Sequence, residues 1–179
     1  MIDKNELLFV VDEENNPAAP LERFLVHKKN LWHRTTGIWV INKKRQILCQ
    51  KRSMKKDTKP GFWEAFFGGH LHPKETYLTS AVTELSEELG ITVSEEELIP
   101  YKIFQSDKPT HKEFQSSYLY ITNRDDTDFQ FEKEEIDQIQ WLDFEELKKY
   151  LVVTNDPEWV HKPWDEEILR YITQLVPKT

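Results

Sequence analysis

Three glutamates, Glu84, Glu87 and Glu88, have the spacing of neighbours on one face of a helix. The pattern over residues 78–89 predicts that helix, because its apolar residues recur at the helical period. Glutamates at i, i+3 and i+4 repel one another, by roughly 0.2–0.5 kcal/mol for each exposed pair. No lysine or arginine lies within this stretch to relieve the repulsion. The arrangement therefore predicts a site for a divalent cation, since Mg²⁺, Mn²⁺ and Ca²⁺ prefer oxygen ligands.

Glycine is scarce in this chain and is concentrated around the predicted helix. Only five of the 179 residues are glycine, well below the usual share of about 7%. Glycine is needed where φ is positive or where the backbone must approach another group closely. We therefore expect a phosphate-bearing ligand to bind in the stretch that contains four of the five glycines: Gly61, Gly68, Gly69 and Gly90.

The glycines and glutamates together resemble the Nudix box. Five residues separate Gly69 from Glu75, and seven more lead to the glutamate-bearing stretch, residues 83–91 (TELSEELGI). Every position of the family's pattern is matched except Thr83, which stands where the family has arginine. The match covers many fixed positions, so a merely solvated acidic helix explains it poorly.

The resemblance implies a role for each matched residue. Glu87 and Glu88 would bind Mg²⁺ or Mn²⁺, and Glu84 would be a further ligand or the general base. Gly69 would offer a backbone oxygen to the metal, and Gly68 and Gly69 would allow close approach of the substrate.

Glu75, Thr83 and Gly90 form the structural part of the motif. Glu75 would orient it through hydrogen bonds. In the family the arginine at the position of Thr83 holds a glutamate in place by ion pairing. Threonine lacks that charge, so either a nearby lysine compensates or catalysis is slow or absent. We favour a working enzyme, because all four glutamates of the motif remain.

Residues outside the motif are candidates for substrate contacts. Arg52 and Lys56 belong to a basic loop directly before the motif, and the alternatives are phosphate binding and an ordinary solvated loop. Glu135 lies where the family often brings one more glutamate as base or ligand; the alternative is a simple acidic loop. Trp39, Trp63 and Phe66 are better explained as core than as base-stacking residues.

The resemblance is strongest to the branch that contains isopentenyl-diphosphate isomerases and their hydrolase relatives. In the isomerases, histidines at the positions of His27, His33 and His70 complete a metal site, although the spacing here is one residue shorter. His70 and His72 are alternatively ordinary surface or hydrogen-bonded residues. The resemblance covers roughly residues 6–150.

The expected fold is α/β (α+β), a Nudix-like mixed β-sheet sandwiched between helices, in a single domain spanning residues 1–179. We expect an N-terminal β-hairpin at about 6–26, including a second strand over residues 21–26, and a core at about 33–150. A helix should follow Asp143, and a C-terminal helical segment should begin at Asn155 and extend over about 155–175.

Composition limits the partners. A net charge of −8 disfavours nucleic acid and anionic membranes, and no apolar run reaches the ~18 residues of a membrane span. A single cysteine excludes an internal disulfide and suits the cytoplasm. We expect a small-molecule diphosphate as the partner, and homodimerisation stays open.

The sequence thus predicts a Mg²⁺- or Mn²⁺-dependent hydrolase of a diphosphate bond, acting on a nucleoside diphosphate or a small molecule linked to one. Two alternatives stay open, an isopentenyl-diphosphate isomerase and a non-catalytic nucleotide-binding Nudix module. The isomerase is disfavoured because Gly68 and Gln115 align with its catalytic cysteine and glutamate. The missing motif arginine is the only support for the non-catalytic module.

Overall fold

A computed structural model describes residues 6–109 and 111–176. The chain divides into two compact units. Unit 1 comprises the residues up to Ile38, Gly68–Ser86 and Thr92–Leu119. Unit 2 comprises Trp39–Phe67, Glu87–Ile91 and the residues from Tyr120 onward. The single-domain organisation stays a prediction.

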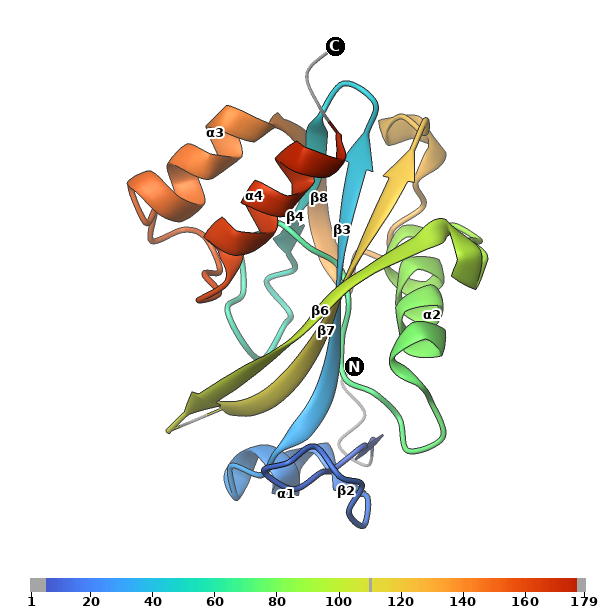
Figure 1. Ribbon diagram of the computed structural model, residues 1–179, viewed down its shortest axis with the longest axis vertical. Helices are drawn as coiled ribbons and strands as arrows, with labels where there is room; N and C mark the ends of the chain where they lie inside the picture. Colours follow the sequence, from blue (N-terminus) through green and yellow to red (C-terminus); the bar gives the residue numbers. More distant parts are fainter. Residues whose placement is uncertain (1–5, 110, 177–179) are drawn as a thin grey trace. The chain divides into compact units, whose positions relative to one another are not determined.

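Unit 1 contains the N-terminal elements and a long strand. The strands β1 (Leu7–Leu8) and β2 (Leu21–Glu22) pair antiparallel and are followed by the short helix α1 (Arg23–Lys28). The strand β6 (Leu98–Lys108) follows the 3₁₀ turn η1 (Glu95–Glu97). The strands β6 and β7 (His111–Thr122) run together as a long twisted pair (Figure 1).

Unit 2 contains three strands and the C-terminal helices. Its strands are β4 (Gln46–Arg52), β5 (Trp63–Glu64) and β8 (Ile136–Asp143), preceded by the 3₁₀ turn η2 (Asp126–Asp128). Helix α3 (Phe144–Lys148) continues into the π-helical turn η3 (Lys149–Val153) and packs beside α4 (Asp165–Leu175) (Figure 1). Their buried faces supply apolar side chains that include Leu147, Ile168 and Ile172.

The strands β3 (His33–Asn42) and β7 (His111–Thr122) contribute residues to both units. Six strands form one sheet in the hydrogen-bonded order β5-β4-β3-β7-β6, and β8 pairs with β4 along its whole length. A sheet combined with helices confirms the expected α/β (α+β) fold. The N-terminal strand pair confirms the expected hairpin.

Two local expectations were wrong. The segment expected to continue the second strand of the hairpin turns into α1 after Glu22. The segment after Asn155 is not helical but pairs with β5: Trp63 N–H donates to Glu158 O and Val160 N–H to Trp63 O, each at 2.8 Å. Pro157 and Pro163 explain this difference, because the residue before a proline disfavours the helical region. The last helix therefore begins at Asp165.

The glutamate-bearing helix is α2 (Tyr77–Leu89). Its apolar face buries Ala81, Leu85 and Leu89 completely, and fully burying one leucine contributes about 1.5–3 kcal/mol. Gly90 ends the helix with φ +65°, the left-handed conformation that glycine adopts without strain. A Cβ on Gly90 would lie 2.7 Å from Gln130 O.

We predict that Gly90→Ala destabilises the protein by about 1–2 kcal/mol or more. Alanine is strained in the left-handed backbone conformation at this position, and its Cβ would also clash with Gln130 O. Urea denaturation measures the free energy of unfolding. Ser86→Ala is the matched control, since Ser86 is exposed in the same helix and alanine favours the helix. Equal stability of Gly90→Ala and the control would contradict the prediction.

Candidate functional site

The three glutamates lie on one continuous helix and differ in exposure. Glu87 is exposed, Glu84 is half-buried and Glu88 is only 8% exposed. Their spacing along α2 places the three carboxylates on one face. Carboxylate oxygens are the ligands that a divalent ion such as Mg²⁺ prefers.

Gly69 forms a cradle for the carboxylate of Glu84. A Cβ placed on Gly69 would lie 2.3 Å from Glu84 Oε1. The carboxylate therefore occupies the space that any other residue at position 69 would fill. Gly69 O accepts a hydrogen bond from Thr36 N–H at 2.9 Å, which leaves one of its two lone pairs for another partner. A carboxylate oxygen and a backbone carbonyl oxygen are both ligand types that suit Mg²⁺ or Mn²⁺.

Gly68 is restricted by the backbone of strand β3. Its φ is +134°, and a Cβ at this position would lie 2.4 Å from Thr36 O. Because a backbone oxygen cannot move aside as a side chain can, only glycine fits. Each glycine thus leaves space for a different neighbour: Gly68 for the carbonyl of Thr36 in β3, and Gly69 for the carboxylate of Glu84 in α2.

Of the structural residues of the motif, Glu75 lies just before α2 and Thr83 lies within it. Glu75 accepts a hydrogen bond from His72 N–H at 2.8 Å and so closes the turn before the helix. Thr83 is exposed, and its hydroxyl donates to Thr79 O at 3.0 Å within the same helix. Thr83 therefore directs its polar atom to its own backbone.

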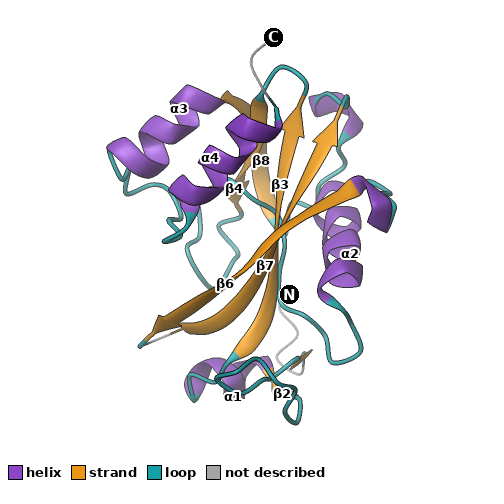
Figure 2. Cartoon of the chain, viewed as in Figure 1, coloured by secondary structure: helices purple, strands orange, loops and turns teal. Residues whose placement is uncertain are grey.

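In unit 2 a loop follows β4 (Figure 2), and basic side chains in and beside this loop pair with carboxylates. Arg52 pairs with Glu64 at 2.8 Å and also donates to Thr58 O. Lys56 forms an ion pair with Glu135. The two residues expected to contact phosphate are thus already paired with carboxylates, and Glu135 has a cation beside it.

The aromatic residues are packed within the protein. Trp39 is 1% exposed and lies near Phe66, with 6.3 Å between ring centroids. Trp63 stacks on Trp159 at 5.9 Å, and Trp159 stacks on Tyr150 at 5.4 Å. This stack attaches the segment after Asn155 to β5, so the core interpretation of these aromatics is consistent with their contacts.

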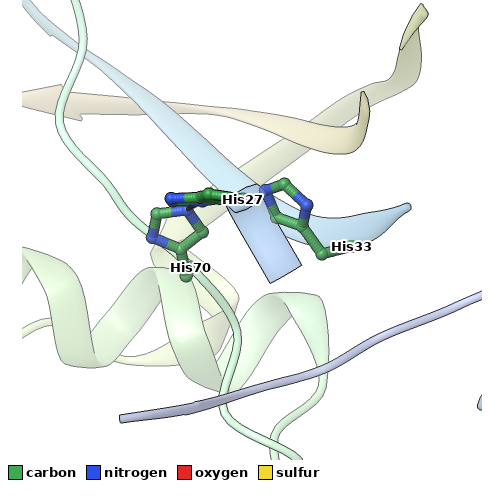
Figure 3. A group of neighbouring side chains, drawn as sticks. All are labelled: His27, His33 and His70. Atoms are coloured by element: carbon green, nitrogen blue, oxygen red, sulfur yellow. Dashed lines mark hydrogen bonds between the residues drawn. The ribbon is translucent and has the colours of Figure 1, made fainter. Parts of the chain in front are cut away.

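A second group of ligand atoms lies in unit 1. His27 of α1, His33 of β3 and His70 offer ring nitrogens within 4.8 Å of one another (Figure 3). His27 Nε2 and His70 Nε2 are 3.1 Å apart. His33 Nδ1 donates to Leu31 O at 2.9 Å, which makes Nε2 the nitrogen with the lone pair. That Nε2 is buried and has no hydrogen-bond partner, so its lone pair is available to a metal ion.

Burial keeps the three rings uncharged at neutral pH. Desolvation lowers the pKa of His33 to about 4 and the pKa of His70 well below its usual range. Desolvation, and then the charge of Arg23, lower the pKa of His27. A metal-binding imidazole must be neutral, and the surroundings favour that form.

The sequence pointed to these three histidines, and to Glu113 only as the acidic neighbour of Gln115; it did not place His111 and Glu113 beside the cluster. Residues 111, 113 and 115 alternate along β7 and so share one face of the strand. His111 Nε2 lies 3.0 Å from Glu113 Oε2, and Thr35 Oγ1 donates to the same oxygen at 3.1 Å. The polar alternation His-x-Glu-x-Gln was the signal that could have identified them.

The sheet and the Gly69–Glu84 arrangement define a protein of Nudix type. The NUDIX domain family model matches residues 31–163. The chain belongs to this family. The match extends past residue 150, where the resemblance was expected to end, and includes the segment that pairs with β5.

Related sequences include both hydrolases and isomerases. The chain is 30% identical over 155 residues to an uncharacterised Nudix hydrolase of Clostridium acetobutylicum, covering 83% of this chain and 75% of that one. It is 31% identical over 149 residues to Nudix hydrolase 3 of Arabidopsis thaliana, covering 78% of this chain and 19% of that one. It is 26% identical over 161 residues to the isopentenyl-diphosphate Delta-isomerase of Salmonella paratyphi B, covering 89% and 87%.

Solved structures show the same fold. The DR0079 protein of Deinococcus radiodurans matches with a TM-score of 0.74 and 22% identity, covering 93% of this chain and 99% of that one. A Caenorhabditis elegans Ap4A hydrolase matches with a TM-score of 0.57 and 17% identity, covering 80% and 96%. The hydrolase relatives support a function of the pyrophosphate-hydrolase type, and Nudix hydrolases generally use divalent metals such as Mg²⁺. In the described part of the chain, no helix is long and apolar enough to cross a membrane.

We predict that Gly69→Ala weakens Mg²⁺-dependent activity about tenfold or more while the fold is kept, because the new Cβ displaces only the flexible carboxylate of Glu84. Activity measured against Mg²⁺ concentration should show a higher half-saturating concentration. Ser86→Ala, a change of similar size on the exposed side of α2, should leave the curve in place. An unchanged curve for Gly69→Ala would show that the cradle is not needed.

Proposed function

We propose that this protein is a Mg²⁺- or Mn²⁺-dependent hydrolase of a diphosphate bond in a nucleoside diphosphate or a small molecule linked to one. The observation that carries the proposal is the cradle in which the Glu84 carboxylate lies against Gly69. Glu87 and Glu88 follow Glu84 on the same helix. The hydrolase relatives support the reaction class.

The glutamates are proposed as the catalytic and metal-binding residues. Glu84, Glu87 and Glu88, with the backbone oxygen of Gly69, would hold the ion. When bound, the ion would neutralise charge on the phosphate oxygens and lower the pKa of a water molecule. Glu84 or Glu135 would accept the proton of the attacking water, since each is a carboxylate that is not fully exposed.

The basic residues are proposed to neutralise and position the substrate. Arg52 presents a planar guanidinium, the group best suited to bidentate contact with phosphate. Gly68 is proposed separately to allow close approach of the substrate to the backbone. Lys56 would alternate between Glu135 and the substrate, so that phosphate binding releases Glu135 to act as a base. Glu75, Thr83 and Gly90 would maintain the shape of the motif.

The isomerase alternative lacks its acid–base pair. Isomerisation of an alkene needs a positioned acid and a base in addition to metal. Gly68, aligned with the isomerase cysteine, leaves no room even for a Cβ beside Thr36 O. Gln115, aligned with the glutamate, carries no proton to exchange. Cys49 is fully buried, and burial raises the pKa of its thiol, so it does not replace the missing acid.

The non-catalytic alternative depends on Thr83 alone. Its hydroxyl donates to Thr79 O and does not supply the charge of an arginine. The catalytic glutamates of the motif are nevertheless all present. We therefore favour hydrolysis over a nucleotide-binding module.

Glu87→Gln should lower kcat at least ~10²-fold, because an amide oxygen binds a divalent ion far more weakly than a carboxylate. Glu96→Gln is the matched control, since Glu96 is exposed and lies outside the motif. Circular dichroism establishes that both variants fold. Full turnover in folded Glu87→Gln would remove the metal role of this residue.

A substrate panel separates the three functions. Purified protein with Mg²⁺ should release product from a nucleoside diphosphate or a nucleoside diphosphate-linked compound. It should form no dimethylallyl diphosphate from isopentenyl diphosphate. Isomer formation at enzyme-like rates would overturn the proposal in favour of the isomerase. Nucleotide binding without hydrolysis across the panel would favour the non-catalytic module.

A further inference from the structure

Unit 2 contains a cavity whose lining the proposed hydrolysis does not use. Its volume is about 330 Å³. It is lined by the turn between β3 and β4, the end of β7, the start of η2 and Trp141 of β8. The strands β3 and β7 end at the same edge of the sheet (Figure 1), which brings the turn and the end of β7 together. Of the described residues that line the cavity, none belongs to the glutamate motif or to the basic loop after β4.

Hydrogen bonds hold the backbone of the basic lining residues in place. Asn42 Oδ1 accepts from Lys44 N–H at 2.9 Å, which closes the turn that carries Lys43 and Lys44. Thr122 Oγ1 accepts from Arg124 N–H at 3.1 Å. The three basic side chains therefore extend from backbone segments that neighbouring side chains fix. A site arranged in advance loses less conformational entropy when a ligand binds.

The lining of the cavity carries more positive than negative charge. Its cations outnumber its carboxylates, Lys43, Lys44 and Arg124 against Asp125 and Asp126. The carboxylate of Asp125 is engaged within its own turn, where it accepts from Thr127 N–H at 3.1 Å and from the Thr127 hydroxyl at 2.5 Å. An excess of cations attracts anions, even in a chain of net charge −8. Ammonium and guanidinium groups bind phosphate through charge-assisted hydrogen bonds, so the lining suits a phosphate group.

Trp141 adds a planar aromatic surface to this polar lining. The residue is half-buried on β8, and its ring centroid lies 6.2 Å from that of Phe129. The Phe129 ring is buried and limits the movement of the indole. Nucleic-acid bases stack on aromatic side chains, because every base has a π-face. An indole and three cations in one lining match a ligand that combines a planar base with phosphate.

We propose that this cavity binds a nucleoside monophosphate, with the phosphate held by Lys43, Lys44 and Arg124 and the base stacked on Trp141. The volume lies near the lower end of the roughly 300–1,000 Å³ that is usual for ligand pockets. It therefore suits one nucleotide better than a dinucleotide. A nucleoside monophosphate has no diphosphate bond, so it is a ligand of this second site and not a substrate of the hydrolysis proposed for the glutamates of α2.

Isothermal titration calorimetry with adenosine monophosphate tests the site. The full chain is titrated in EDTA, which removes divalent ions and so keeps metal-dependent binding at the glutamates out of the measurement. We expect one nucleotide bound per chain. Adenosine, which lacks the charge, and inorganic phosphate, which lacks the base, should each bind at least ~10-fold more weakly. Absence of nucleotide binding at millimolar concentration, or phosphate binding as tight as that of the nucleotide, would overturn the proposal.

Two double variants with the same change in net charge localise the binding. Lys43→Gln/Lys44→Gln removes two exposed charges from the cavity and should weaken nucleotide binding at least ~10-fold. Lys148→Gln/Lys149→Gln is the matched control, because it removes two adjacent exposed lysines that do not line this cavity. It should bind the nucleotide as the unmodified chain does. Circular dichroism checks that both variants fold, and equal nucleotide affinity in the two would contradict the proposed site.

Trp141→Leu separates recognition of the base from recognition of the phosphate. This variant should bind the nucleotide at least ~10-fold more weakly than the unmodified chain, because leucine offers no aromatic face. Its affinity for inorganic phosphate should stay the same, which also establishes that the cavity is intact. Unchanged nucleotide affinity in Trp141→Leu would overturn the stacking of the base.

Discussion

The pairing of residues 68–71 with the start of β3 is the constraint on which both candidate sites depend. Thr36 N–H donates to Gly69 O at 2.9 Å, and Leu71 N–H donates to Arg34 O at 3.0 Å. Between them, His70 pairs with Thr35 in an isolated antiparallel bridge. This register places Gly69 against the Glu84 carboxylate and brings His70 to the histidine near the start of β3. A shift of one residue would exchange the two faces of the segment and separate both sets of ligands.

The two sets of ligands differ in donor type, and this difference decides which ions they suit. The glutamates on α2 and the carbonyl of Gly69 offer oxygen, the donor that Mg²⁺ prefers. The histidines offer neutral nitrogen, because burial lowers their pKa values. One glycine-containing segment thus contributes to the proposed oxygen site through Gly69 and to the histidine cluster through His70.

Unit 2 pairs its charges within itself. Arg52 pairs with Glu64, and Lys56 pairs with Glu135. The Arg52–Glu64 pair is mostly buried, with side-chain exposures of 16% and 9%, so removing one partner would leave an uncompensated charge. The stack of Trp63 on Trp159 holds the C-terminal segment against the strand that carries Glu64. These pairs hold the basic residues in a defined place.

The sequence by itself determined the glutamate helix, its glycine end and the mixed α/β class, because these follow from local periodicity and from the special backbone of glycine. Only the tertiary structure decided that Glu84 lies against Gly69 and that His111 and Glu113 adjoin the cluster, since residues far apart in sequence meet through strand pairing. It also decided that the segment after Asn155 is not helical. There, pairing with β5 and the two prolines outweighed a weak helical pattern. Local sequence patterns specify individual helices and strands. Which candidate ligands come together depends on the register in which the strands pair, and no local pattern contains that information.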